Sequence, residues 1–63
     1  MNFNQATLYA RQGYTILLPN WKGYFNWDYN KRELVFKNGD YNLSEKELID
    51  KGLDQRTDWY YIV

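Results

Sequence analysis

The segment Asn20 to Lys31 (NWKGYFNWDYNK) concentrates aromatic side chains that could stack on a flat ligand. The whole chain of 63 residues contains seven tyrosines, three tryptophans and three phenylalanines. A domain of this size buries only about 60% of its unfolded surface, so we expect a substantial share of these rings to stay partly exposed. The exposed rings would serve either as contacts between subunits or as stacking platforms for nucleobases.

Trp21 is the ring that the sequence places best for binding. It follows Pro19-Asn20 and precedes Lys22-Gly23, so we expect it on a loop with a cation beside it. For the other aromatic residues, packing in the core or in a subunit contact is the more common role.

Catalytic chemistry is not indicated. The chain has no histidine and no cysteine, so the commonest general base and the thiol nucleophile are both missing. Ser44 is the only serine, and its spacing to Glu47 is that of a helix capping box. Asp54 and Asp58 fit a solvated turn better than an acid–base pair. We therefore expect a protein that is not an enzyme and that carries no cofactor and no metal.

The charge balance and the absence of long apolar runs limit the partners. Eight basic and eight acidic residues cancel, whereas a duplex-DNA binder would carry a basic excess. The run Ile16-Leu17-Leu18 is too short to span a bilayer, and no signal peptide is visible, so a cytoplasmic protein without a membrane partner is expected. Small chains without disulfides often gain stability by association, so we expect a homo-oligomer.

The elements that would position these residues form an α+β domain over residues 1–63. We expect a small antiparallel sheet of four to five strands and two short helices. The first helix is predicted over Gln5 to Gln12, with Asn4 as N-cap and Gly13 closing it. The second is predicted to run from the Ser44 cap to Lys51. The predicted strands are Tyr14–Leu18, Tyr24–Tyr29, Glu33–Lys37, Asp40–Leu43 and Thr57–Val63.

Two local patterns make sharper predictions. Asn38-Gly39 is typical of a type I′ turn, which needs positive φ at both central residues. The alternation in residues 24–29 places Phe25, Trp27 and Tyr29 on one face of their strand, packed against the sheet or a second subunit.

Five short motifs occur in a particular order along the chain: Phe3, Gln5-Ala6, Arg11-Gln12-Gly13-Tyr14, Asn20-Trp21-Lys22-Gly23 and Asp58-Trp59. This order resembles the short phage proteins that counter Thoeris immunity by sequestering its signalling nucleotide. The resemblance implies a non-enzymatic sponge for a cyclic ADP-ribose isomer or another cyclic nucleotide. It also implies a small α+β unit that assembles into dimers or tetramers, with the ligand bound between subunits in the cytoplasm of the infected host.

Eight residues are candidate contacts for such a ligand, three of them by their match to the family and the others by the chemistry that a nucleotide needs. Trp21 matches the loop tryptophan of the family, and Asp58-Trp59 matches its closing acidic–Trp pair. The flat walls for a base would be Trp21, Tyr24 and Trp59. The cations for a diphosphate would be Arg11, Lys22 and Arg56. The partners for ribose hydroxyls would be Asn20 and Asp58.

Two other functions would use the same aromatic residues. A protein–protein inhibitor of a host defence nuclease or effector, of anti-CRISPR or anti-restriction type, would use them as hot spots. A single-strand nucleic-acid binder would stack bases on the strand from Tyr24 to Trp27, but the balanced charge disfavours it.

Overall fold

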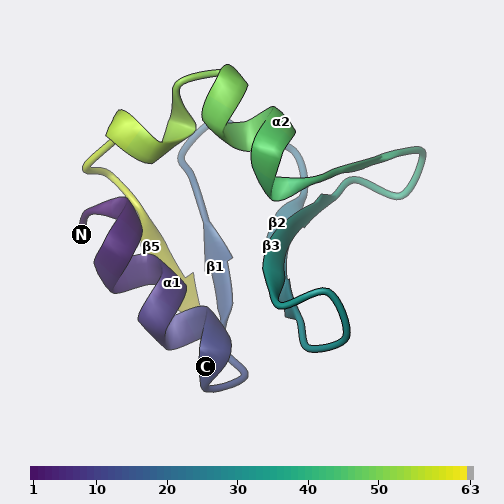
Figure 1. The fold of residues 1–63 in the computed structure, drawn as a ribbon. Coiled ribbons are helices and arrows are strands. Elements are labelled where there is room, and N and C mark those ends of the chain that lie inside the picture. Colours follow the sequence, from purple (N-terminus) through teal and green to yellow (C-terminus); the bar gives the residue numbers. More distant parts are fainter. Residues whose placement is uncertain (63) are drawn as a thin grey trace.

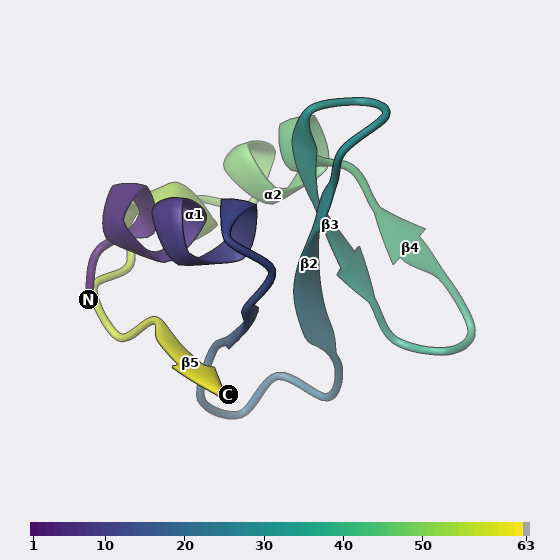
Figure 2. The same ribbon diagram turned by 90° about the horizontal axis from the view of Figure 1, so that it is seen from below.

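The computed structural model describes residues 1–62 and shows a five-stranded antiparallel sheet with both α-helices on one face (Figures 1 and 2). The elements in chain order are α1 (Phe3–Arg11), β1 (Thr15–Leu17), β2 (Tyr24–Asp28), β3 (Glu33–Lys37), β4 (Asn42–Leu43), α2 (Glu45–Asp50), the 3₁₀ helix η1 (Leu53–Gln55) and β5 (Tyr60–Ile62). The strand order is β4-β3-β2-β1-β5. The predicted α+β class is therefore confirmed. No helix among residues 1–62 is both long and apolar enough to cross a membrane.

Helix α1 begins earlier than predicted because Asn2, not Asn4, is its N-cap. The Asn2 side chain accepts a hydrogen bond from the Gln5 backbone N–H at 2.8 Å, and the Gln5 side chain accepts one from the Asn2 N–H at 3.0 Å. This reciprocal capping box satisfies two amides that the first turn leaves without helical partners. At the other end Gly13 follows the helix with φ of 101°, as predicted for a closing glycine.

Replacing Asn2 by alanine is expected to lower the free energy of unfolding by about 1 kcal/mol, because the first turn loses its cap. Urea denaturation followed by circular dichroism would measure this loss. The matched control is Asn4→Ala, which removes an exposed side chain from the same turn and is expected to change stability by less than about 0.5 kcal/mol. Equal losses in the two variants would contradict the assignment of the cap.

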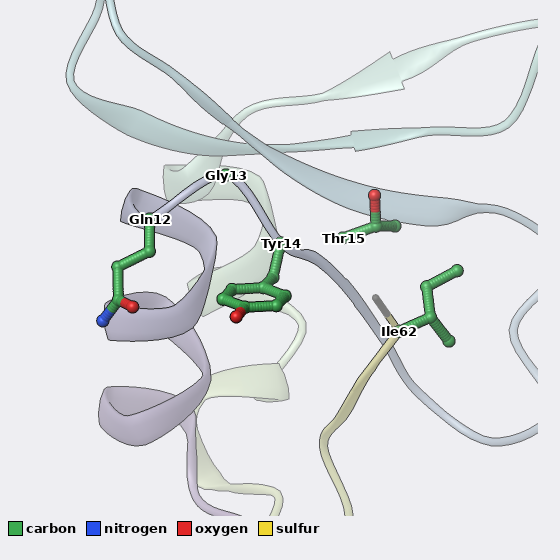
Figure 3. Close-up of a pocket in the computed structure, with 5 residues that line it drawn as sticks. All are labelled: Gln12, Gly13, Tyr14, Thr15 and Ile62. Atoms are coloured by element: carbon green, nitrogen blue, oxygen red, sulfur yellow. The ribbon is translucent and has the colours of Figure 1, made fainter.

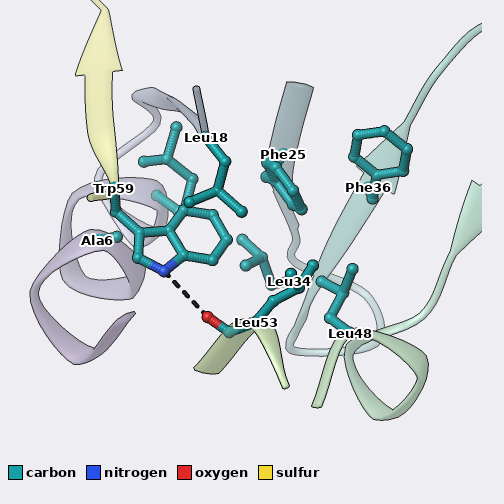
Figure 4. Packing of buried hydrophobic residues seen from close by; sticks show 10 residues of the cluster. Ala6, Leu18, Phe25, Leu34, Phe36, Leu48, Leu53 and Trp59 are labelled. Carbon is teal, nitrogen blue, oxygen red and sulfur yellow. Dashed lines mark hydrogen bonds between the residues drawn. The ribbon is translucent and has the colours of Figure 1, made fainter. Parts of the chain in front are cut away.

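The core lies between the two helices and the sheet (Figure 4). Its buried hydrophobic residues are Ala6, Ala10, Ile16, Leu18, Phe25, Leu34, Phe36, Leu48, Leu53 and Trp59. Phe25 is central, with its ring centroid 4.8 Å from that of Phe36 and 4.8 Å from that of Trp59. Each fully buried large side chain contributes roughly 1.5–3 kcal/mol, so this cluster is the main source of stability.

The register of the sheet fixes which side chains face the helices. Phe25 pairs with Phe36, and Trp27 pairs with Leu34, on the helix-covered face. Tyr24 pairs with Lys37 on the opposite face. The predicted inward phase of Phe25 and Trp27 is therefore confirmed, because neighbouring residues of a strand point to opposite faces. The prediction is wrong for Tyr29, which follows the end of β2 and is 62% exposed.

The Asn38-Gly39 pair does not form the predicted type I′ turn. Lys37 pairs with Asn42, which leaves residues 38–41 in the loop, and Gly39 but not Asn38 has positive φ. The Asn38 side chain instead donates from Nδ2 to the Lys22 backbone oxygen at 2.7 Å. A tertiary contact with the loop between β1 and β2 has therefore replaced the local turn preference.

The remaining boundaries differ little from expectation. β3 coincides with its predicted range, whereas the other strands are shorter than predicted, and Val63 lies outside the described residues. The predicted capping box of α2 is confirmed, since Ser44 Oγ accepts from the Glu47 N–H at 3.4 Å and Glu47 Oε1 accepts from the Ser44 N–H at 3.2 Å.

Candidate ligand-binding trough beside helix α1

Trp21, the first predicted ligand wall, packs against the edge of the core. Its ring centroid lies 5.2 Å from that of Phe36 at an interplanar angle of 90°, and 6.1 Å from that of Phe25. The side chain is only partly exposed. Tyr24, its predicted companion, is 42% exposed and lies on the opposite face of the sheet. Trp21 and Tyr24 therefore do not form one wall.

The loop that carries Trp21 is held tightly. Asn20 adopts a positive φ of 68°, and Gly23 has φ of 135°. A Cβ atom on Gly23 would lie 2.5 Å from the Lys37 backbone oxygen, so only glycine allows this approach to β3. Together with the hydrogen bond from Asn38 to Lys22, this contact fastens the loop to the hairpin of β3 and β4.

Arg56 and Asp58 bind each other. Arg56 Nε donates to Asp58 Oδ1 at 2.8 Å, and Arg56 Nη2 contacts Asp58 Oδ2. The hydrogen bond from Arg56 lowers the pKa of the Asp58 carboxyl group below its ordinary value. A phosphate at Arg56 or a ribose hydroxyl at Asp58 would have to compete with this exposed ion pair.

The prediction that Trp59 stacks on a ligand is wrong. Trp59 is 2% exposed, and its indole Nε1–H donates to the Leu53 backbone oxygen at 3.2 Å (Figure 4). Its ring packs on Phe3 at 5.5 Å and on Phe25 at 4.8 Å between centroids. Trp59 is a core residue, because a fully enclosed ring has no face left for a base.

Arg11 lies at the other end of the sheet from the Asn20–Lys22 loop. It precedes β1, whereas the loop follows β1. Its guanidinium carbon lies 4.8 Å from the centroid of the Trp27 ring, which is a cation–π contact. Its backbone oxygen accepts a hydrogen bond from the Tyr29 hydroxyl at 3.0 Å. A single chain therefore does not bring the eight predicted residues together.

A hollow of about 430 Å³ lies where α1 leads into β1 (Figure 3). It is lined by Gln12, Gly13, Tyr14, Thr15 and Ile62. A second hollow, of about 330 Å³, shares Gly13, Tyr14 and Thr15 with the first. Its other lining residues are Ala10, Asn26, Trp27, Tyr29 and Lys37. We call the two hollows together the α1–β1 trough.

The trough is open because β1 and β2 separate there. Only Ile16 and Phe25 form a register pair between these strands. Beyond that pair the two strands are bridged by side chains, since Thr15 Oγ1 donates to Asn26 Oδ1 at 3.2 Å. The bridge places two polar side chains among the lining residues, which also include the rings of Tyr14, Trp27 and Tyr29.

Tyr14, which lines both hollows, packs against two further tyrosines, Tyr9 and Tyr61. The Tyr9 and Tyr61 rings stack at 4.3 Å with an interplanar angle of 12°. Tyr14 meets both edge-on, at 5.6 Å from Tyr9 and 5.2 Å from Tyr61. The neighbouring Tyr9 phenol and burial raise the pKa of the Tyr61 hydroxyl above its ordinary value. Tyr14 is thus held in one orientation from two sides.

The charges at the trough suit an anionic ligand with a flat ring. Trp27 and Tyr14 offer aromatic surface, and Lys37 is the charged residue of the lining. Arg11 lies over the Trp27 ring and lines a separate hollow together with Glu45. Among residues 1–62 no group of three or more acidic side chains is placed to hold a metal ion. The arrangement can bind a ligand by stacking and ion pairing.

Of the eight predicted residues, only Arg11 lies beside the trough. The trough residues Tyr14, Trp27 and Lys37 were not predicted to bind ligand. The signal that could have indicated Tyr14 was its position directly after the helix-ending Gly13, where a ring can lie against the end of α1. For Lys37 no local signal exists, because its place depends on the pairing of β2 with β3.

The fold and the trough together define a small α+β domain with a hollow beside α1. No family model matches the sequence, and neither the curated proteins nor the solved structures contain a match to it. The chemistry of its own residues is therefore the basis for assigning a function.

Proposed function

We propose that this protein is a phage anti-defence protein that sequesters a cyclic nucleotide or ADP-ribose-derived immune signal in the host cytoplasm without cleaving it. The observation that best supports this function is the α1–β1 trough, in which aromatic surface and cations adjoin. Its two hollows, of about 430 and 330 Å³, fall within the size range of small-molecule sites. The order of sequence motifs described above points to the same class of ligand.

The roles within the trough follow from its chemistry. A base would stack on Tyr14 or Trp27, which is worth roughly 1–3 kcal/mol for each base. Phosphates would lie near Arg11 and Lys37, because ionised donors form the stronger hydrogen bonds to phosphate. The Asn26 side chain, bridged to Thr15, would meet ribose hydroxyls. A chain of zero net charge fits this role, since a single small ligand carries few charges.

The trough is open at the sheet edge formed by β5, where Ile62 lines it. We propose that a second subunit completes the pocket there, as the sequence motifs implied. The trough would then be one half of a closed site, which would shield the ligand from water.

Replacing Tyr14 by alanine is expected to weaken nucleotide binding about ten- to a hundredfold, because one stacking surface is lost. Isothermal titration calorimetry against a panel of cyclic nucleotides and ADP-ribose derivatives would measure this. The matched control is Tyr41→Ala, which removes a 52% exposed tyrosine on the hairpin of β3 and β4, away from the trough. It should bind as the unaltered protein does.

Three results would count against the proposal. The first is no heat from any nucleotide with the unaltered protein at high micromolar concentration. The second is equal affinity in Tyr14→Ala and Tyr41→Ala, both shown to be folded by circular dichroism. The third is a cleaved product among the molecules released by denaturing the complex, which would indicate a hydrolase. A sequestered ligand should be released with an unchanged mass and retention time.

A protein–protein inhibitor of a host defence nuclease or effector is the alternative. The observation that favours it is the exposure of Tyr24, Tyr60 and Ile62, at 42%, 44% and 51%, on the sheet face away from the helices. Affinity capture from host lysate tests this alternative. The alternative predicts that one host protein is recovered in stoichiometric amount. It also predicts that this host protein is no longer recovered when Tyr24 is replaced by alanine.

A further inference from the structure

Asn38 and Gly39 form a pair with a chemical reactivity that ligand binding does not use. The chain contains seven asparagines, and only Asn38 is followed by glycine. In such a pair the backbone nitrogen of the glycine can attack the side-chain carbonyl carbon of the asparagine, because glycine has no Cβ to shield that nitrogen. The residues that follow the other six asparagines all have larger side chains: Phe3, Gln5, Trp21, Trp27, Lys31 and Leu43. Asn38 is therefore the asparagine most prone to this attack.

The surroundings of Gly39 leave room for the reaction. Gly39 is exposed, its φ is 83°, and no atom beyond its two chain neighbours lies within 4 Å of the position a Cβ would take. The Asn38 backbone N–H donates to the Tyr41 oxygen at 3.2 Å, whereas the Gly39 N–H donates to no backbone oxygen within residues 1–62. An amide without a hydrogen-bond acceptor loses its proton more easily than a bonded one, and the deprotonated nitrogen is the nucleophile.

The side chain of Asn38 supplies the group that the reaction removes. Its Nδ2 donates to the Lys22 backbone oxygen at 2.7 Å, which joins the hairpin of β3 and β4 to the loop between β1 and β2. Attack on the side-chain carbonyl carbon turns that carbon towards Gly39, so this hydrogen bond has to open first. Nδ2 then leaves as ammonia. The atom that fastens the loop is thus the atom that is lost.

We propose that Asn38 is a site of spontaneous deamidation, and that the reaction releases the loop of residues 20–23 from the hairpin of β3 and β4. The Gly39 nitrogen gives its proton to base and bonds to Asn38 Cγ. The bond between Cγ and Nδ2 breaks, and Nδ2 takes up a proton and leaves as ammonia, with a succinimide ring left in the chain. Water opens the ring at either carbonyl to give aspartate or isoaspartate. In total, water is consumed and ammonia is released, without an oxidant and without an enzyme.

Both products lose the contact with Lys22. A carboxylate has no N–H to donate, so its oxygens would face the Lys22 carbonyl oxygen as a second acceptor. Isoaspartate also puts an extra carbon into the backbone between β3 and β4. The loop keeps its packing contacts, those of Gly23 against β3 and of Trp21 against Phe36. We therefore expect the loop to open more often while the core beneath it stays folded.

Peptide mapping of the folded, unaltered protein tests the first step. The protein is kept in mildly alkaline buffer, sampled over time, digested at mildly acidic pH where cyclisation is slow, and mapped by tandem mass spectrometry. Asn38 should convert at least about tenfold faster than each of the other six asparagines, because its neighbour has no Cβ. Gly39→Ala should slow the conversion of Asn38 by a similar factor. Conversion of Asn38 at the rate of the others, or an unchanged rate in folded Gly39→Ala, would overturn the proposal.

Limited proteolysis with trypsin, which cleaves after Lys22, tests the release of the loop. Asn38→Asp reproduces one product of the reaction. Its cleavage after Lys22 should be about three- to tenfold faster than in the unaltered protein, since one hydrogen bond no longer holds the loop closed. The matched control is Asn42→Asp, which adds the same charge at an exposed position of the same hairpin and should leave this rate unchanged. Cleavage after Lys51, at the end of α2, is the reference for global unfolding.

The two sites of cleavage separate local from global opening. Faster cleavage after Lys22 alone, in Asn38→Asp and in the deamidated protein, supports the release of the loop. Equal cleavage after Lys22 in Asn38→Asp and Asn42→Asp, both folded by circular dichroism, contradicts it. A matching rise after Lys51 also contradicts it, because the chain would then open as a whole. No nucleotide is present in either experiment, so the results are independent of the proposed function.

Discussion

Trp59→Ala is expected to leave the chain largely unfolded at room temperature. Truncating a fully buried Trp to alanine costs about 3–5 kcal/mol, and the Leu53 backbone oxygen would also lose its indole donor. A domain of 63 residues has a total stability of only about 3–9 kcal/mol. Far-ultraviolet circular dichroism and urea denaturation would show the loss.

The control for this variant is Trp59→Phe, which keeps a ring against Phe3 and Phe25 but removes the N–H donor. It is expected to remain folded with a stability reduced by about 1–3 kcal/mol. If Trp59→Ala unfolded at the same urea concentration as the unaltered protein, Trp59 would not be a core residue, and a role for it in ligand binding would return.

Gly23→Ala is expected to lower the free energy of unfolding by roughly 2–4 kcal/mol, nearly as much as Trp59→Ala. The new methyl group would lie 2.5 Å from the Lys37 backbone oxygen and 2.8 Å from the Phe36 ring. That oxygen cannot move away freely, because Lys37 is paired with Tyr24 in the sheet. The backbone would also have to hold φ near 135° with a side chain present.

Gly39→Ala separates the two causes of this loss. Gly39 also has positive φ, at 83°, but no atom lies within 4 Å of the position its Cβ would take. Gly39→Ala should therefore lower the free energy of unfolding by about 1–2 kcal/mol, which is the cost of the left-handed conformation alone. Urea denaturation of both variants gives the comparison. Equal losses would mean that β3 does not approach Gly23 as closely as the structure places it.

The elements that could be predicted from the sequence are those fixed by local chemistry. The capping box of Ser44 and Glu47 marks the start of α2, and the alternation around Phe25 gives the inward face of β2. The N-cap of α1 could also have been predicted correctly from the sequence. Asn2 has a glutamine three residues later, as a capping box requires, whereas Asn4 has Thr7 at that position.

The conformation of the Asn38-Gly39 turn could not be predicted from the neighbouring residues alone. Its sequence favours a two-residue hairpin, and no nearby residue indicates that Asn38 will donate to Lys22. The contact joins segments that approach only after β2 and β3 have paired. Tertiary hydrogen bonds of this kind override turn preferences.

The candidate site was harder to predict than the fold, because its residues come from separate strands. The trough depends on where β1 and β2 part, and on which face Lys37 occupies. Trp59 was misplaced for a related reason. It stands beside the exposed Asp58 and begins a segment rich in aromatic residues, and only the packing of α1 and η1 shows that its ring is enclosed.

The position of β5 in the sheet has a consequence for the folding pathway. β2, β3 and β4 follow one another and pair through short connections, whereas β5 returns to β1 from the far end of the sequence, with Tyr60 opposite Leu17. The entropy cost of closing a loop rises with its length, so distant pairings form late. The three-strand meander is therefore expected to nucleate first. The core stays incomplete until the β1–β5 ladder closes and carries the indole of Trp59 into place.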